Sequence, residues 1–164
     1  MTYTAAGDRY ETLEYRRAGN SGLDLPAFSF GLWQKFGTDH PFQTQRDIVL
    51  RAFDLGITHF DNADRYGPPH RAQDSAFLSP DVIDDTYRQR ASALNDLAVQ
   101  RGQSLAQLAL QWVLRQPQVT SALIGASSTW QLEHNVKALD FPALTEQELA
   151  LIDEHGVHGT GLKL

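Results

Sequence analysis

The sequence contains no cysteine, and only three of its 164 residues are lysines. Without cysteine the chain has no disulfide, no thiolate nucleophile and no zinc–thiolate site. No apolar run approaches the roughly 20 residues that a membrane helix requires, and the first residues lack the basic-then-apolar pattern of a signal peptide. We therefore expect a soluble cytoplasmic protein without a membrane partner.

The charge of the chain is negative overall but mixed along its length. The formal net charge is −6 and the pI is about 5.4, and no five like charges follow one another. This balance argues against a nucleic-acid partner. A chain of 164 residues with 41% hydrophobic residues suits one domain with a real core.

Residue periodicity predicts alternating strands and helices after a polar N-terminal arm over residues 1–12. The expected strands cover residues 14–17, 23–25, 27–32, 57–61 and 119–124. The first two flank the turn-forming segment Ala18–Gly22 and predict a β-hairpin. The next two are joined by one helix with short links, so this βαβ unit should hold two parallel strands.

Capping motifs mark where the helices should begin. They are Thr44–Asp47, Ser79–Pro80, Ser104–Gln107, Ser128–Gln131 and Thr145–Glu148. A hydroxyl followed three residues later by a carboxylate or amide can satisfy free N–H groups of the first turn, and proline suits the first helical position. Gly56 should end the helix that Thr44 opens.

Asp61 and Tyr66 form a candidate proton-transfer site at the end of the strand over 57–61. A tyrosine can protonate a carbonyl oxygen while hydride arrives at the carbon, but its pKa must first fall from about 10. A lysine ammonium commonly lowers it, and an aspartate can hold that lysine. The alternative is structural: Asp61 caps the loop and Tyr66 packs on the surface.

Small residues after the last strand, from Gly125 to Asn135, form a second candidate site. A glycine and hydroxyl residues at a strand end that opens a helix leave N–H groups for an anion such as a nucleotide phosphate. The alternative is an ordinary helix cap. Trp33 either walls a substrate pocket or packs in the core. No pair among the histidines has convincing metal spacing, so we expect no metal site.

Four segments of the sequence resemble the aldo-keto reductase family, in the branch of L-glyceraldehyde 3-phosphate reductase and the potassium-channel β subunits. The segments are Tyr15–Pro26, Gly31–Trp33, Phe60–Pro69 and Arg101–Asn135. The resemblance implies a (β/α)₈ TIM barrel that binds NADPH and reversibly reduces small aldehydes or ketones. It makes Tyr66 the acid and Asp61 its electrostatic support. It places five residues near the adenosine phosphate end of the cofactor: Gly125, Ser127, Ser128, Gln131 and Asn135.

The resemblance also implies that part of the barrel is missing. Such a barrel takes about 250 residues, and the family's middle strands have no counterpart after Pro69. We expect one truncated domain with the first two strands and the last strand: an N-terminal part over 1–69, a junction over 70–78 and a C-terminal part over 79–164. The family's lysine and active-site histidine fall in the gap.

Three expectations follow from that gap. Catalysis should be impaired, and the alternative function is a non-catalytic remnant that binds a nucleotide or serves in assembly. Open strand edges invite pairing, so we expect self-association. Ser128 stands where many relatives have an arginine for the cofactor's 2′-phosphate, which leaves the preference for NADP over NAD open.

Overall fold

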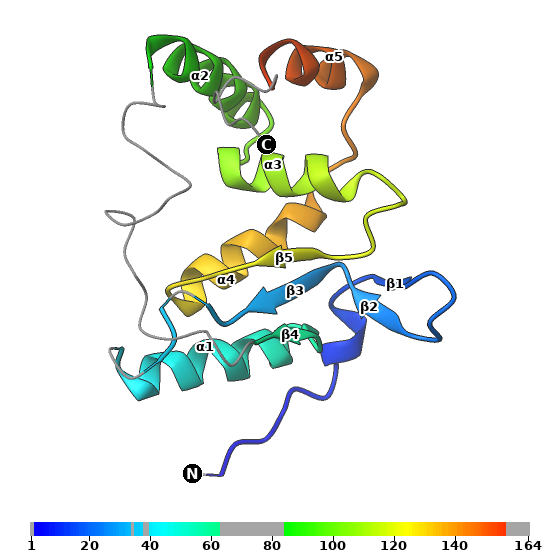
Figure 1. The fold of residues 1–164 in the computed structure, drawn as a ribbon, viewed down its shortest axis with the longest axis vertical. Coiled ribbons are helices and arrows are strands. Elements are labelled where there is room, and N and C mark those ends of the chain that lie inside the picture. Colours follow the sequence, from blue (N-terminus) through cyan, green and yellow to red (C-terminus); the bar gives the residue numbers. More distant parts are fainter. Residues whose placement is uncertain (1, 34, 38–39, 63–83, 157–164) are drawn as a thin grey trace.

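The chain forms an α/β structure with two small sheets, seen here in a computed structural model that describes residues 2–33, 35–37, 40–62 and 84–156 (Figure 1). The strands are β1 (Tyr15–Arg17), β2 (Asp24–Pro26), β3 (Phe28–Gly31), β4 (Phe60–Asp61) and β5 (Ala122–Ile124). The α-helices are α1 (Phe42–Asp54), α2 (Asp85–Gln100), α3 (Leu105–Leu114), α4 (Thr129–Val136) and α5 (Glu146–His155). Two 3₁₀ turns are η1 (Arg9–Glu11) and η4 (Lys137–Asp140).

The strand pairing confirms the predicted hairpin and the parallel βαβ unit. Strands β1 and β2 pair antiparallel. The second sheet has the order β4–β3–β5 with both pairs parallel, so β3 lies between one strand close in sequence and one far away. Strand β4 is shorter than predicted, because the N–H of Ile57 bonds to Ala52 O at the end of α1 instead of joining the ladder. The described residues form no closed barrel.

Two helices, α1 and α4, cover one face of the three-stranded sheet. Phe28 and Phe30 of β3 are fully buried on this face, together with Ile48 of α1 and Leu132 of α4. Burying one such side chain contributes about 1.5–3 kcal/mol, so these four residues fix which face of the sheet is covered. The two helices are also joined by an ion pair between Arg51 and Glu133.

The opposite face of the sheet is polar and partly open. Ser29 of β3 shares hydrogen bonds with His59 and Ser121 at 2.8 and 2.6 Å, which links β3 to the residues directly before β4 and β5. Leu123 of β5 is 57% exposed there. Among the described residues β4 and β5 are the two edge strands.

A second, separate apolar cluster joins α2, α3 and α5 (Figure 1). Its buried residues are Leu97, Ala98, Leu108 and Ile152. Arg101, at the end of α2, ties the cluster together: it donates to Glu148 Oε1 of α5 at 2.6 Å, to Gln111 Oε1 of α3 and to the carbonyl of Pro142. This part of the chain therefore has a core of its own, distinct from the core under the sheet.

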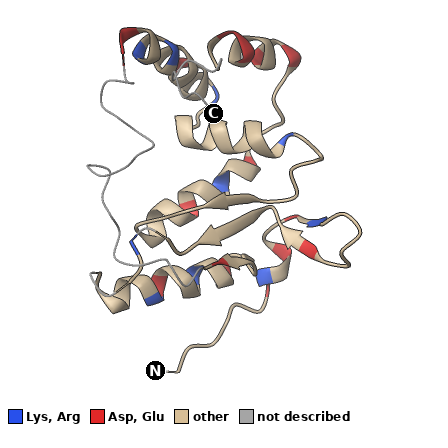
Figure 2. Ribbon diagram, in the orientation of Figure 1, with Lys and Arg blue, Asp and Glu red and all other residues tan. Residues whose placement is uncertain are grey.

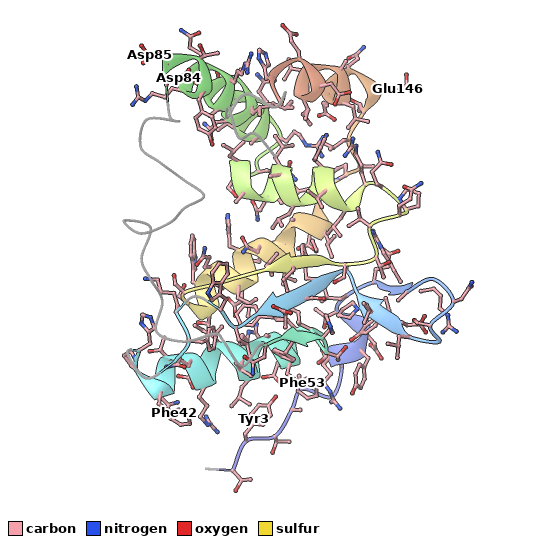
Figure 3. The ribbon with its side chains drawn as sticks, viewed as in Figure 1. Tyr3, Phe42, Phe53, Asp84, Asp85 and Glu146 are labelled. Atoms are coloured by element: carbon pink, nitrogen blue, oxygen red, sulfur yellow. The ribbon has the colours of Figure 1, made fainter. Side chains whose placement is uncertain are left out.

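Three of the predicted helix caps are confirmed. The hydroxyls of Ser104, Ser128 and Thr145 each accept from the backbone N–H three residues later. The predicted start of α2 at Ser79–Pro80 lies outside the described residues. Within them α2 begins at Asp85, because Asp84 is extended and its carboxylate accepts from the N–H of Tyr87; Figure 3 labels Asp84 and Asp85 at this end of the helix.

The predicted capping box at Thr44–Asp47 is wrong. Helix α1 begins earlier, at Phe42, and the N-cap position is Pro41, which makes no side-chain cap. Two side-chain hydrogen bonds explain why the helix does not begin at Thr44: one joins the helix to the loop before it, and one lies within the helix. The amide of Gln45 bonds to the loop before the helix, and the carboxylate of Asp47 accepts from Gln43 Nε2 at 2.6 Å.

The N-terminal arm is tied to the end of α1. The hydroxyl of Tyr3 and the N–H of Ala6 both donate to Asp54 Oδ1, at 2.6 and 2.9 Å; Figure 3 shows Tyr3 beneath α1. The hydrogen bond from Tyr3 is the main cause that holds the pKa of Asp54 below its usual value. The arm packs closely against Gly56, directly after α1, because a Cβ at this position would clash with the carbonyl oxygen of Arg9.

Basic and acidic residues are both scattered over the structure (Figure 2), in keeping with the mixed charge of the sequence. Among the described residues no helix is long and apolar enough to span a membrane.

We predict that Gly56→Ala lowers the free energy of unfolding by about 2 kcal/mol or more, because a left-handed backbone and a close backbone contact both oppose a Cβ. The matched control is Gly102→Ala. Gly102 has a similar positive φ of 71°, but nothing lies within 4 Å of the place that a Cβ would take, so only the conformational cost of roughly 1 kcal/mol should appear. Urea unfolding measures both, and equal losses would contradict the packing argument.

We predict that Glu148→Gln removes about 2 kcal/mol at neutral pH. Burial alone raises the pKa of Glu148, but the N–H of Thr145, the guanidinium of Arg101 and the hydroxyl of Thr145 together hold this pKa below its usual value. A lowered folded-state pKa means that the stabilisation is complete above the unfolded pKa of about 4.3 and is lost as pH falls through the folded value.

Urea titrations at several pH values measure the difference in free energy of unfolding between the wild-type chain and Glu148→Gln. This difference should shrink below about pH 4. Glu133→Gln is the control, since its ion pair with Arg51 has side chains 38% and 42% exposed and should contribute at most about 1 kcal/mol. A loss at Glu148 that stays constant down to acid pH contradicts the assignment of the effect to its charge.

Candidate functional site

A cavity of about 460 Å³ opens at the carboxyl ends of β3, β4 and β5. Parallel strands end at the same edge of a sheet, and this edge is where α/β proteins commonly bind ligands. The lining residues come from all three strand ends and the loops that follow: Gly31, Trp33, Lys35, Asp61, Leu123, Ile124, Gly125, Ala126, Ser127 and Gln131.

The cavity brings together five of the residues that the sequence singled out. Asp61 and Trp33 line it from the N-terminal part of the chain, and Gly125, Ser127 and Gln131 line it from the C-terminal part. Ser128 and Asn135 are not among the lining residues. Tyr66 lies outside the described residues.

Asp61 reaches the cavity because the register of the sheet places it there. It pairs with Gly31 across β3 and β4, and its carbonyl accepts from the N–H of Leu32 at 3.0 Å. The residue is half-buried at the mouth of the strand. It stands beside the start of the β3 loop, within the same hollow as Trp33.

Trp33 lines the cavity and is not a core residue. Its side chain is 52% exposed, whereas Phe30, three residues earlier in β3, is fully buried. An exposed indole at the mouth of a cavity offers a flat apolar surface for a planar ligand. The core interpretation of Trp33 is therefore wrong, and its role as the wall of a substrate pocket stays a prediction.

The start of α4 is a self-capped helix. Ser128 Oγ accepts from the N–H of Gln131, and Gln131 Oε1 accepts from the N–H and the hydroxyl of Ser127 at 2.8 and 3.0 Å. These bonds agree with the helix-cap interpretation and engage two N–H groups that an anion would otherwise use. Asn135 is buried further along α4. Trp130 stacks on His134 at 5.0 Å one turn apart on the same helix.

Lys35 lines the cavity, although it was not among the site residues predicted from the sequence. It follows β3 in a loop and has a φ of 66°, the one positive φ outside glycine in the described part of the chain. The loop is fixed directly after the lysine. Phe36 packs edge-to-face on Phe30 at 5.7 Å, and Gln45 of α1 bonds to both the N–H and the carbonyl of Gly37.

A second cavity of about 470 Å³ lies elsewhere, between the hairpin and α3, with Arg16 and Arg115 in its lining. Arg16 already donates to the carbonyls of Leu114 and Val119 at 2.9 Å. Among the residues that the structure describes, no group of His, Asp and Glu side chains could hold a metal ion. The first cavity is therefore the candidate site.

Comparison with known proteins points to one family. Residues 69–157 match the Aldo/keto reductase family. The chain is 49% identical over 77 residues to L-glyceraldehyde 3-phosphate reductase of Escherichia coli K12, which is 47% of this chain and 22% of that protein. The match confirms the family and branch predicted from the sequence.

Two plant proteins described as probable voltage-gated potassium channel subunits beta are also similar. The one from Oryza sativa is 40% identical over 73 residues, and the one from Arabidopsis thaliana is 38% identical over 74 residues. In each case the match covers 44% of this chain and 22% of the relative. The chain thus spans less than a quarter of the length of these relatives in each match.

We predict that Gln45→Met loosens the loop that presents Lys35, since it removes the acceptor of the Gly37 N–H. A hydrogen bond that contributes about 1 kcal/mol slows amide exchange roughly fivefold. The Gly37 amide should therefore exchange about fivefold faster in Gln45→Met than in the wild-type chain. Gln43→Met is the control, because Gln43 lies on the same helix but bonds to Asp47. Hydrogen exchange followed by NMR measures the Gly37 amide in both variants. Equal exchange rates would contradict the role of Gln45 in holding this loop.

Proposed function

The chain belongs to the aldo/keto reductase family, and from this premise we propose that it binds NADPH in the cavity at the carboxyl edge of the sheet and reduces small aldehydes or ketones slowly. The observation that supports the proposal is the joint lining of one cavity. Asp61 and Trp33 meet Gly125, Ser127 and Gln131 there, although the two groups lie in different halves of the sequence.

The residues present suit a nucleotide cofactor. The cavity volume of about 460 Å³ lies within the range of roughly 300–1,000 Å³ that is usual for small-molecule sites. The exposed indole of Trp33 offers a planar surface, and Ser127 offers a hydroxyl. These groups combine apolar walls with few polar groups, which is the usual make-up of a cofactor site.

In the proposed reaction NADPH supplies the hydride when bound, and this chain supplies the proton. The hydroxyl of Tyr66 gives its proton to the carbonyl oxygen of the substrate, and the carboxylate of Asp61 provides electrostatic support. A phenol with an ordinary pKa near 10 is a weak acid at neutral pH. We propose that this chain lacks the family's lysine and active-site histidine, as the resemblance implies, and that turnover is therefore impaired.

The substrate class follows from the relatives. The name of the Escherichia coli relative gives L-glyceraldehyde 3-phosphate as its substrate. We extend to this chain only the class of small carbonyl compounds, for which methylglyoxal is a convenient representative.

The sheet is proposed to be part of a (β/α)₈ barrel in one truncated domain. Strands β3 and β4 would be its first two strands and β5 its last. The domain would consist of an N-terminal part over residues 1–69, a junction over 70–78 and a C-terminal part over 79–164. The order β4–β3–β5 supports this, because closure of a barrel makes the last strand a neighbour of the first. The edges of β4 and β5 are proposed to pair with further copies, as unpaired edges tend to do.

We predict that NADPH quenches the fluorescence of Trp33 saturably and that methylglyoxal then causes slow cofactor oxidation. Tyr66→Phe should abolish oxidation and leave quenching unchanged, because the phenol acts on the proton and not on cofactor binding. Tyr87→Phe is the control, since Tyr87 lies on the exposed face of α2. Stopped-flow absorbance and fluorescence measure the two steps.

The outcomes separate the two candidate functions. Quenching without oxidation in the wild-type chain would support a nucleotide-binding remnant instead of an enzyme. Oxidation that rises more steeply than the protein concentration would support a site completed by self-association. No quenching and no oxidation would contradict the proposed function as a whole.

A further inference from the structure

We propose that Lys35 is the anion-binding residue of the cavity at the carboxyl edge, and that its ammonium group contacts a phosphate of the ligand held there. The inference rests on the proposed function for the presence of a ligand in this cavity. It adds a residue and a chemical class: the ligand carries a phosphate, either on the cofactor or on the carbonyl substrate.

The loop geometry is the first support. A non-glycine residue with φ near 60° costs about 1–2 kcal/mol and persists only where the surroundings hold it, which is common at ligand sites. Lys35 has a φ of 66°. Phe36, which packs against the core, and Gln45 on α1 fix the chain directly after it. The lysine is therefore held with its side chain in the lining of the cavity.

The charge of the cavity is the second support. Among the described residues of the lining, Lys35 is the one basic side chain and Asp61 is the one acidic side chain. Among the described residues Lys35 takes part in none of the ion pairs, so its ammonium is not neutralised by Asp61 at short range. In a chain with a formal net charge of −6, such a local cation favours the binding of an anion.

The start of α4 is the third support, because it offers fewer N–H donors than the sequence predicted. The N–H groups of Ser127 and Gln131 are engaged by side chains of the same turn. Among the described residues, a phosphate in this cavity would therefore rely less on this turn and more on the lysine. An ammonium on a flexible stem has three donors and forms charge-assisted hydrogen bonds with phosphate oxygens.

The low lysine content permits a direct test. Reductive ¹³C-methylation of the intact protein keeps the charge and labels only Lys35, Lys137, Lys163 and the N-terminal amine. Lys137 lies on η4 outside the cavity lining and is an internal control. The signals are assigned with Lys35→Met, Lys137→Met and Lys163→Met, and titrated with NADPH, glyceraldehyde 3-phosphate, unphosphorylated glyceraldehyde and inorganic phosphate.

We expect the Lys35 signal to shift saturably with at least one of the two phosphorylated ligands, while the Lys137 signal stays in place and glyceraldehyde has no effect. A shift with NADPH identifies the cofactor as the source of the phosphate. A shift with glyceraldehyde 3-phosphate alone, with no quenching of Trp33 by NADPH, supports the role of Lys35 and contradicts the proposed cofactor site.

Affinity gives an independent readout. Lys35→Met should weaken binding of the phosphorylated ligand about tenfold, as expected for the loss of one charge-assisted hydrogen bond, and should flatten its dependence on salt. Lys137→Met should leave both unchanged. Quenching of Trp33 that is equal in the two variants, with no Lys35 shift, overturns the inference and leaves the proposed function standing. Equal shifts of all lysine signals, or no shift with any anion, also overturn it.

Discussion

The parallel pairing of β3 with both of its neighbours is the constraint on which the rest of the structure depends. It aligns Phe28 with Ala122 and Gly31 with Asp61, so strand ends from distant parts of the sequence meet at one edge. A slip by one residue would turn Phe28 and Phe30 away from α1 and α4 and move Ser29 into the core. The burial of these two rings therefore fixes the register, and the register places the cavity residues.

Much of the fold could be predicted because its signals are local. The turn Ala18–Gly22 defines the hairpin, and the caps at Ser104 and Thr145 need only their own first turn of helix. The prediction at Thr44 failed because tertiary bonds decide where α1 begins. The amide of Gln45 reaches back to Gly37 and His40, and it holds the chain so that the helix starts at Phe42.

The candidate site divides in the same way. Asp61, Trp33 and Gly125 could be predicted to lie together because each stands at or directly after a strand end, where parallel strands converge. Asn135 lies too far along α4 to reach the cavity lining. Lys35 could not be predicted, since its place depends on a left-handed backbone and on a tether from another element. The residue types around Lys35 predict neither the left-handed backbone nor the hydrogen bonds from Gln45.

Binding and catalysis place different demands on this cavity. Binding an anionic ligand requires a fixed cation and a shaped wall, which Lys35 and Trp33 provide from a single loop pinned to α1 and to the core. Proton transfer requires in addition a phenol whose pKa has been lowered by a cation close to its oxygen. The first demand involves one loop, whereas the second needs a cation placed against a residue of another loop. The proposed binding role therefore needs fewer parts of the chain than the proposed turnover does. Helices α2, α3 and α5 are held together by their own core around Arg101. The demands of the cavity therefore fall on the three-stranded sheet and the loops at its edge.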